Sequence, residues 1–243
     1  MGFGYCCRQR TTARAEHIRE GDAMLTKKLA WVVCLGALAG CSSTGSSDFD
    51  VFADRVNDGV ALAERVDGLA FTAFDAVPSS GSAEFAGLAD VFADRDIDAS
   101  SDDLSMIGDV AITVDFTAGT VTGDISNFAM AENLRLNEGD VSSVEGSLAL
   151  GDRSSNIGRA APQAGPTGPN AGDTSYDGTL QTRLGDVTVA GELTGRFAGT
   201  RVNNPDTDFP IKAMIGDSQI DDATLGDETV VFDISIYAEN DGS

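Results

Sequence analysis

Residues 109–128 read DVAITVDFTAGTVTGDISNF, and this stretch predicts a β-hairpin. Before the turn at 117–119, apolar side chains occupy every second position: Val110, Ile112, Val114 and Phe116. After the turn, a second run alternates in the same way. A period of two places one face of a strand in a core and the other in water. The hairpin therefore indicates an antiparallel sheet with one wet face.

The same alternation recurs along most of the chain. Three further clear runs lie at 83–93, 187–199 and 230–236. Weaker ones lie near 69–77, 144–151, 175–184 and 211–220. The total is eight or nine strands, enough to close a barrel, and closure removes exposed sheet edges. Glycines on the apolar face at Gly191, Gly195 and Gly199 fit the bending and close packing of a small barrel.

A barrel of this kind could also span a membrane, because lipid-facing strands alternate too. Aromatic girdles mark such barrels, and beyond residue 40 the chain has no tryptophan and only two tyrosines, Tyr176 and Tyr237. We therefore predict an all-β fold with a single antiparallel soluble β-barrel over residues 68–243 and an apolar interior.

Residues 48–67 have a different period. Apolar side chains recur there at steps of three or four: Phe49, Phe52, Val56, Val60, Ala63 and Val66. This is the stripe of an amphipathic helix, which Asp48 can cap and Gly68 can end. We expect a short helix that precedes the barrel and packs against it. Residues 152–175 hold three prolines and four glycines, and they predict one long loop, either a binding loop or a plain connection.

The segment before the helix resembles a bacterial lipoprotein signal. Lys27 and Lys28 precede an apolar run at 29–38, which is too short to span a bilayer and has the length of a signal-peptide core. Leu38-Ala39-Gly40-Cys41 then resembles the lipobox, in which the cysteine receives lipid and becomes the new N-terminus. The alternatives are an ordinary signal peptide or a buried apolar segment. A Ser/Gly-rich tether follows at 41–47.

The start of the chain leaves two readings open. Residues 1–23 lack apolar periodicity, and Met24 stands just before the basic pair. Either translation starts at Met24 or the signal has a long mixed-charge head. In both cases residues 1–40 form the upstream extension and signal peptide.

Cleavage before Cys41 leaves 203 residues with a simplified chemistry. Six of the 16 basic and three of the 39 acidic residues precede Cys41, so the mature chain has 10 basic and 36 acidic residues and a net charge near −26. Such a field repels nucleic acid, so we expect no nucleic-acid partner. Either adaptation to salty water or a basic partner would account for this negative charge.

Loss of residues 1–40 also removes the reactive side chains. His17 is the only histidine, and three of the four cysteines precede Cys41. A mature chain without histidine or free thiol cannot build a Ser-His-Asp triad, a Cys-His pair or an ordinary zinc site. We expect no enzyme activity and no cofactor. A glycosidase with two carboxylates is the remaining enzyme class.

Several glycine-rich motifs in order resemble the barrel of the transferrin-binding protein B family. They are SSGSAEFAG (79–87), VDFTAGTVTGDISNF (114–128), SYDGTLQT (175–182) and AGELTGRFAG (190–199). The resemblance covers about 68–238 and implies an eight-stranded barrel on a small lipoprotein. This chain has room for one barrel and no handle domain, and it lacks the family's glycine-aromatic ending. Transferrin binding is therefore not carried over.

One acidic segment has part of a calcium-loop pattern. Asp94, Asp96 and Asp98 occupy alternate positions, as the first three ligands of such a loop do. Ala99 and Ser105 then stand where the turn glycine and the bidentate glutamate belong. A solvated acidic turn explains the same residues, so these three are weak metal candidates.

Together these patterns predict an outer-membrane lipoprotein anchored through Cys41, on the periplasmic face or the cell surface. Its barrel is expected to be a binding module for a protein or a solute. A structural envelope lipoprotein without a specific ligand is the alternative. The ligand-binding residues are not indicated by the sequence.

Overall fold

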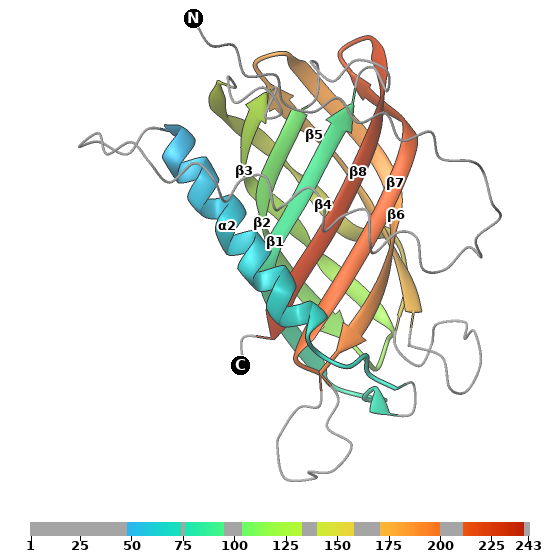
Figure 1. Cartoon of the computed structure of the whole chain (residues 1–243). Coiled ribbons are helices and arrows are strands. Elements are labelled where there is room, and N and C mark those ends of the chain that lie inside the picture. Colours follow the sequence, from blue (N-terminus) through green and yellow to red (C-terminus); the bar gives the residue numbers. More distant parts are fainter. Residues whose placement is uncertain are drawn as a thin grey trace, which may run out of the picture. The chain divides into compact units, whose positions relative to one another are not determined.

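The structure, a computed structural model, describes residues 48–73, 76–94, 104–132, 140–157, 171–199 and 211–240 (Figure 1). One helix precedes eight strands: α2 (Asp48–Asp67), β1 (Ser82–Asp94), β2 (Leu104–Asp115), β3 (Thr120–Glu132), β4 (Val141–Asn156), β5 (Ala171–Thr182), β6 (Gly185–Ala198), β7 (Ala213–Leu225) and β8 (Glu228–Asn240). Each strand pairs antiparallel with the next, and β1 pairs with β8 to close the barrel. The all-β barrel and its preceding helix are confirmed.

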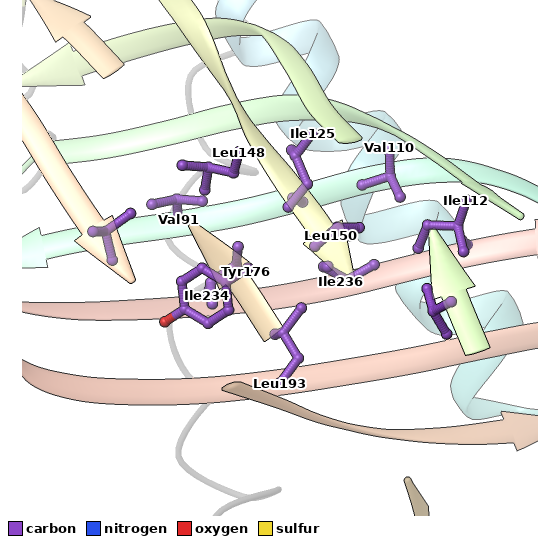
Figure 2. Close-up of a cluster of buried hydrophobic side chains, with 14 of the residues drawn as sticks. Val91, Val110, Ile112, Ile125, Leu148, Leu150, Tyr176, Leu193, Ile234 and Ile236 are labelled. Atoms are coloured by element: carbon purple, nitrogen blue, oxygen red, sulfur yellow. The ribbon is translucent and has the colours of Figure 1, made fainter. Parts of the chain in front are cut away.

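Alternation decides which side chains enter the barrel. Figure 2 shows apolar side chains from many strands meeting inside it, among them Val110, Ile125 and Leu148. Polar side chains such as Glu84, Thr113 and Thr122 alternate with them and are exposed. The predicted apolar interior is confirmed, and this polarity is opposite to that of barrels with an apolar, lipid-facing outer wall.

The hairpin of residues 109–128 turns at Asp115. Its carboxylate accepts hydrogen bonds from the backbone N–H groups of Thr117 and Ala118, at 2.8 and 3.0 Å. Gly119 then takes a positive φ of 71°, and its N–H donates to the Asp115 carbonyl. An aspartate that caps its own turn and a glycine with positive φ are the turn chemistry that the sequence indicated.

A bulge in β3 shifts the register of this hairpin. Ile125 pairs with Val110, whereas Ile107 pairs with Ala129, so β3 holds one residue more than β2 between these pairs. Asn127 sits in the bulge with a φ of 51°, a conformation that asparagine tolerates better than most residues. Because of the extra residue, Phe128 points inward as Ile125 does.

Helix α2 lies along the outside of the barrel (Figure 1) and has the predicted bounds. Its buried side chains are Phe52, Leu62 and Val66, so Leu62 belongs to the packed face although the expected stripe left it out. A Cβ on Gly59 would lie 3.3 Å from the Ile107 side chain, so this glycine lets helix and sheet approach closely. The packed face is therefore shifted around the helix, toward Gly59 and Leu62, from the stripe that the sequence pattern predicts.

The helix runs from one end of the barrel to the other. Phe52 packs with Ile107 of β2 and Ala131 near the end of β3, while Val66 packs with Ala198 and Ala213, where β6 ends and β7 begins. We call the first the upper end and the second the lower end, as they stand in Figure 1. Strands β1, β3, β5 and β7 finish at the upper end, and β2, β4, β6 and β8 finish at the lower end.

Two expectations about the chain between strands were wrong in part. Within the described part, residues 69–77 form no full strand. Phe71 makes an isolated bridge to Ala198, because it contacts only the last residue of β6. The expected loop at 152–175 is shorter at both ends, since β4 continues to Asn156 and β5 begins at Ala171. Pairing between these two strands supplies backbone partners that the glycine-rich composition did not indicate.

Within the described residues, no helix combines the length and the apolar character needed to cross a bilayer.

Candidate functional site

A small cavity lies in the barrel interior near the lower end. Its volume is about 30 Å³, and its lining is largely apolar, with contributions from Leu150, Leu193 and Ile236. The hydroxyl of Thr174, which also lines it, already donates to Ser155 at 3.2 Å. An apolar cavity that holds benzene is roughly 150 Å³, so this one is too small for an ordinary organic ligand.

Three glycines in one row leave this cavity open. Gly172, Gly195 and Gly216 are direct neighbours across β5, β6 and β7, and all three line it. A Cβ on Gly216 would meet its nearest atoms at 3.7–4.0 Å, which is ordinary van der Waals contact. Its φ also lies outside the left-handed region. Gly216 therefore leaves space unfilled without being required by crowding or backbone strain.

Gly191, which lies on β6 with Gly195, has the opposite role. A Cβ there would lie 2.6–2.8 Å from the ring and hydroxyl of Tyr176, its partner across β5 and β6. Tyr176 is fully buried, stacks on Phe232 with centroids 6.3 Å apart, and has its hydroxyl 3.3 Å from Ser218 Oγ. The glycine makes room for a large aromatic side chain that fills the barrel. Most of the interior is thus occupied by the protein itself.

The lower end carries an exposed aromatic side chain. Phe71 is 43% exposed, and the Arg196 guanidinium lies 5.3 Å from the centre of its ring. Backbone bonds hold the segment in place: the Thr72 N–H donates to the Phe197 carbonyl, and the Gly199 N–H donates to the Ala70 carbonyl. A rigidly held aromatic ring under an arginine has the composition of an interaction hot spot.

Aromatic packing beneath this point closes the lower end of the barrel. Phe197 lies 5.6 Å from Phe116 and 6.2 Å from Phe85, measured between ring centres. All three rings are buried. The surface around Phe71 therefore rests on packed aromatic rings.

A second polar cluster lies beside the C-terminus of α2. Burial raises the pKa of Tyr237 to about 12. The negative charges of Asp67, Asp217 and Asp90 contribute less to the same rise. Burial also raises the pKa of Asp67. Both shifts disfavour the charged forms of Tyr237 and Asp67. We therefore interpret this cluster as a packing contact beside the helix.

The sequence-predicted site residues fare differently. Cys41 lies outside the described residues, and so do Asp96 and Asp98, so lipidation and calcium binding stay predictions. Asp94 is the last residue of β1 and is partly buried. Across the ranges that the structure covers, no group of three or more His, Cys, Asp or Glu side chains could hold a metal ion.

The candidate glycosidase chemistry finds no support at the cavity, because none of the described residues that line it carries a carboxylate. Sequence reasoning did not predict the contact between Phe71 and Arg196, because the two residues are far apart in the chain.

No protein-family model, no curated protein and no solved structure matches this chain. The assignment of a function therefore rests on the residues and their arrangement.

Proposed function

We propose that this protein is an envelope lipoprotein, anchored in the outer membrane through Cys41, whose barrel is an interaction module for another protein. The resemblance to the transferrin-binding protein B barrel supports the proposal, and so does the lipobox. The module works with its outer surface. The observation that carries this point is the apolar cavity of about 30 Å³ inside the barrel, which is too small for an ordinary organic ligand.

The surface around Phe71 and Arg196 is the best candidate for the contact. Interface hot spots are enriched in aromatic and arginine side chains. The Phe71 ring is exposed, and backbone hydrogen bonds on either side hold its backbone, so little backbone entropy remains to be lost on binding. An exposed aromatic ring beside an arginine suits a protein partner.

The filled interior also favours a second candidate, the structural envelope lipoprotein without a specific ligand. The two functions differ in one respect. An interaction module loses its partner when Phe71 is removed, whereas a structural lipoprotein has no partner to lose.

The anchor is tested with Cys41→Ala in cells that process lipoproteins. The variant should leave the membrane fraction or fail to mature, and it should lose palmitate labelling, because the thiol is the point of attachment. Intact-mass spectrometry of wild type should find residues 1–40 removed. Unchanged membrane partition together with unchanged labelling would contradict the anchor.

The contact surface is tested with residues 48–243 immobilised in three forms: wild type, Phe71→Ala and Val51→Ala. Val51 is 51% exposed on α2 and serves as a matched apolar control, away from the Phe71 bridge. We expect an envelope or medium protein to be retained by wild type and the control and lost with Phe71→Ala. Equal retention by all three forms would place binding elsewhere, and no retention by any would favour the structural function.

A further inference from the structure

The position of α2 on the barrel bears on how the anchored protein is oriented. The helix begins beside the upper end, where Phe52 packs against Ala131 and Val141 lies in the same cluster. It ends beside the lower end, where Val66 packs with Ala198 and Ala213. The chain therefore enters the folded unit at the upper end of the barrel. At 1.5 Å a residue, a helix of 20 residues is about 30 Å long, enough to separate the two ends.

Polar contacts fix the helix at both of its ends. Near its start, Arg55 donates to Asp109 at 2.7 Å and to the Asn127 carbonyl at 2.8 Å. Near its finish, Arg65 donates to both carboxylate oxygens of Glu239, at 3.2 and 2.9 Å. With the buried apolar face between them, these contacts hold the helix in one direction along the barrel.

The connection from Cys41 to Asp48 is short. Seven residues reach at most about 25 Å when fully extended. A lipid on Cys41 is thus within reach of the upper end. The lower end lies farther away by the length of the helix.

From this we infer that α2 orients the barrel on the membrane: the upper end faces the lipid surface, and the lower end, with Phe71 and Arg196, faces away from it. The inference rests on the proposed lipid anchor. It assigns the membrane-facing side to the end of the barrel at which β1, β3, β5 and β7 finish, and it explains why an interaction surface would lie at the lower end.

The acidic charge of the upper end is compatible with this orientation. Among the described residues, this end carries carboxylates at Asp94, Glu132, Asp140, Asp227 and Glu228. The guanidinium of Arg183, a described residue at the same end, is held by two of them, with Glu132 at 2.6 Å and Asp140 at 3.2 Å. Electrostatic repulsion from anionic headgroups decays over about 8 Å at physiological salt, less than the reach of the tether. The acidic end can therefore face the membrane without touching it.

The test uses the lipidated full-length protein, matured in cells and purified into liposomes. Its only mature cysteine is Cys41, whose thiol carries the lipid, so an introduced cysteine is labelled uniquely. Asp227→Cys labels the β7–β8 turn at the upper end, and Ala118→Cys labels the β2–β3 turn at the lower end; both positions are exposed. A fluorophore at each site is then quenched by acceptor-labelled headgroups.

We expect severalfold stronger quenching at position 227 than at position 118. Equal quenching at the two positions, or stronger quenching at 118, would overturn the inference. If the anchor itself is wrong, neither labelled protein floats with the liposomes, and this outcome refutes the proposed function separately.

A second variant isolates the contribution of the helix. A long Gly/Ser insertion between Ser47 and Asp48 frees the barrel to turn, so the difference in quenching between positions 227 and 118 should shrink severalfold. An unchanged difference would mean that the barrel surface binds lipid directly, and it would refute the role assigned to α2.

Discussion

Two parts of the barrel wall differ in what covers them. Under α2, outward-facing side chains of the strands are apolar: Leu88, Ile107, Ala129, Ala131, Ala213 and Ile215. Away from the helix, the outer face carries a row of hydroxyls that are direct neighbours across five strands: Ser147, Thr179, Thr188, Thr224 and Thr229. One pair in this row, Thr179 and Thr188, has its hydroxyl oxygens 3.2 Å apart. Apolar and polar side chains thus alternate along the strands where the outer wall is not covered by α2. Under α2 this alternation is lost, because apolar side chains also face outward.

We expect a Leu→Ala substitution to lower the free energy of unfolding by three different amounts, according to where the leucine lies. Leu148 lies inside the closed barrel, Leu62 lies between helix and wall, and Leu184 lies on an exposed turn. A closed barrel cannot collapse onto a cavity, whereas a helix on its surface can shift. The five predictions below follow from this comparison, from the largest expected effect to the smallest.

Leu148→Ala should lower the free energy of unfolding by about 3–5 kcal/mol, because the cavity it leaves is surrounded by the whole barrel. Urea denaturation checks the value. Leu184→Ala, at 38% exposure, is the control and should change it by less than about 0.5 kcal/mol. A loss below about 1 kcal/mol at position 148 would mean that the interior is loosely packed.

Leu62→Ala should cost about 2 kcal/mol, less than Leu148→Ala, because α2 can move toward the space. The same urea series measures it. Far-ultraviolet circular dichroism should show the strand signal intact, since the helix covers the barrel without closing it. A cost as large as that of Leu148→Ala would make the helix an integral part of the core.

Arg55→Ala should destabilise by about 1–2 kcal/mol, because it removes hydrogen bonds to a carboxylate and to the carbonyl of the bulge residue. Arg65→Ala should cost less than Arg55→Ala, because exposed ion pairs contribute little to stability. The Arg55 side chain is 20% exposed and that of Arg65 is 56% exposed. Thermal unfolding at two salt concentrations compares them, and the reverse order would contradict the comparison.

High pH should loosen the covered wall through Tyr237. The pKa of its phenol is about 12 in the folded protein and near 10.0 in the unfolded chain, so the folded state holds the proton more tightly. Stability is therefore lost as the pH rises from about 10 toward 12. Tyr237→Phe should show a smaller loss in parallel unfolding curves. Phenolate absorbance reports the titration, and identical curves for the two proteins would refute the assignment.

Gly216→Ala should be neutral or stabilise by about 0.4–1 kcal/mol, because the added methyl group enters the cavity and the unfolded chain loses freedom. Gly191→Ala is the contrasting variant and should destabilise, since its methyl group collides with Tyr176. Calorimetry of both variants measures the difference. Destabilisation by both would mean that the glycine row is required for packing.

The sequence by itself determined the local structure of this protein. Alternation with a period of two depends on nearest neighbours, so all eight strands could be located, and the stripe at residues 48–67 gave the helix with its bounds. The turn at 117–119 was also predictable from the sequence, because its hydrogen bonds join residues within four positions. The resemblance of residues 38–41 to a lipobox is local as well, and lipidation of Cys41 stays a prediction.

Only the tertiary structure decided what depends on residues far apart. Closure pairs Leu88 with Tyr237, and the register brings Gly172, Gly195 and Gly216 into one row. The contact of Phe71 with Arg196 and the direction of α2 along the barrel belong to the same group. Periodicity assigns each side chain a face but no partner. Partners follow from strand register and barrel curvature, which are set when non-local contacts form together.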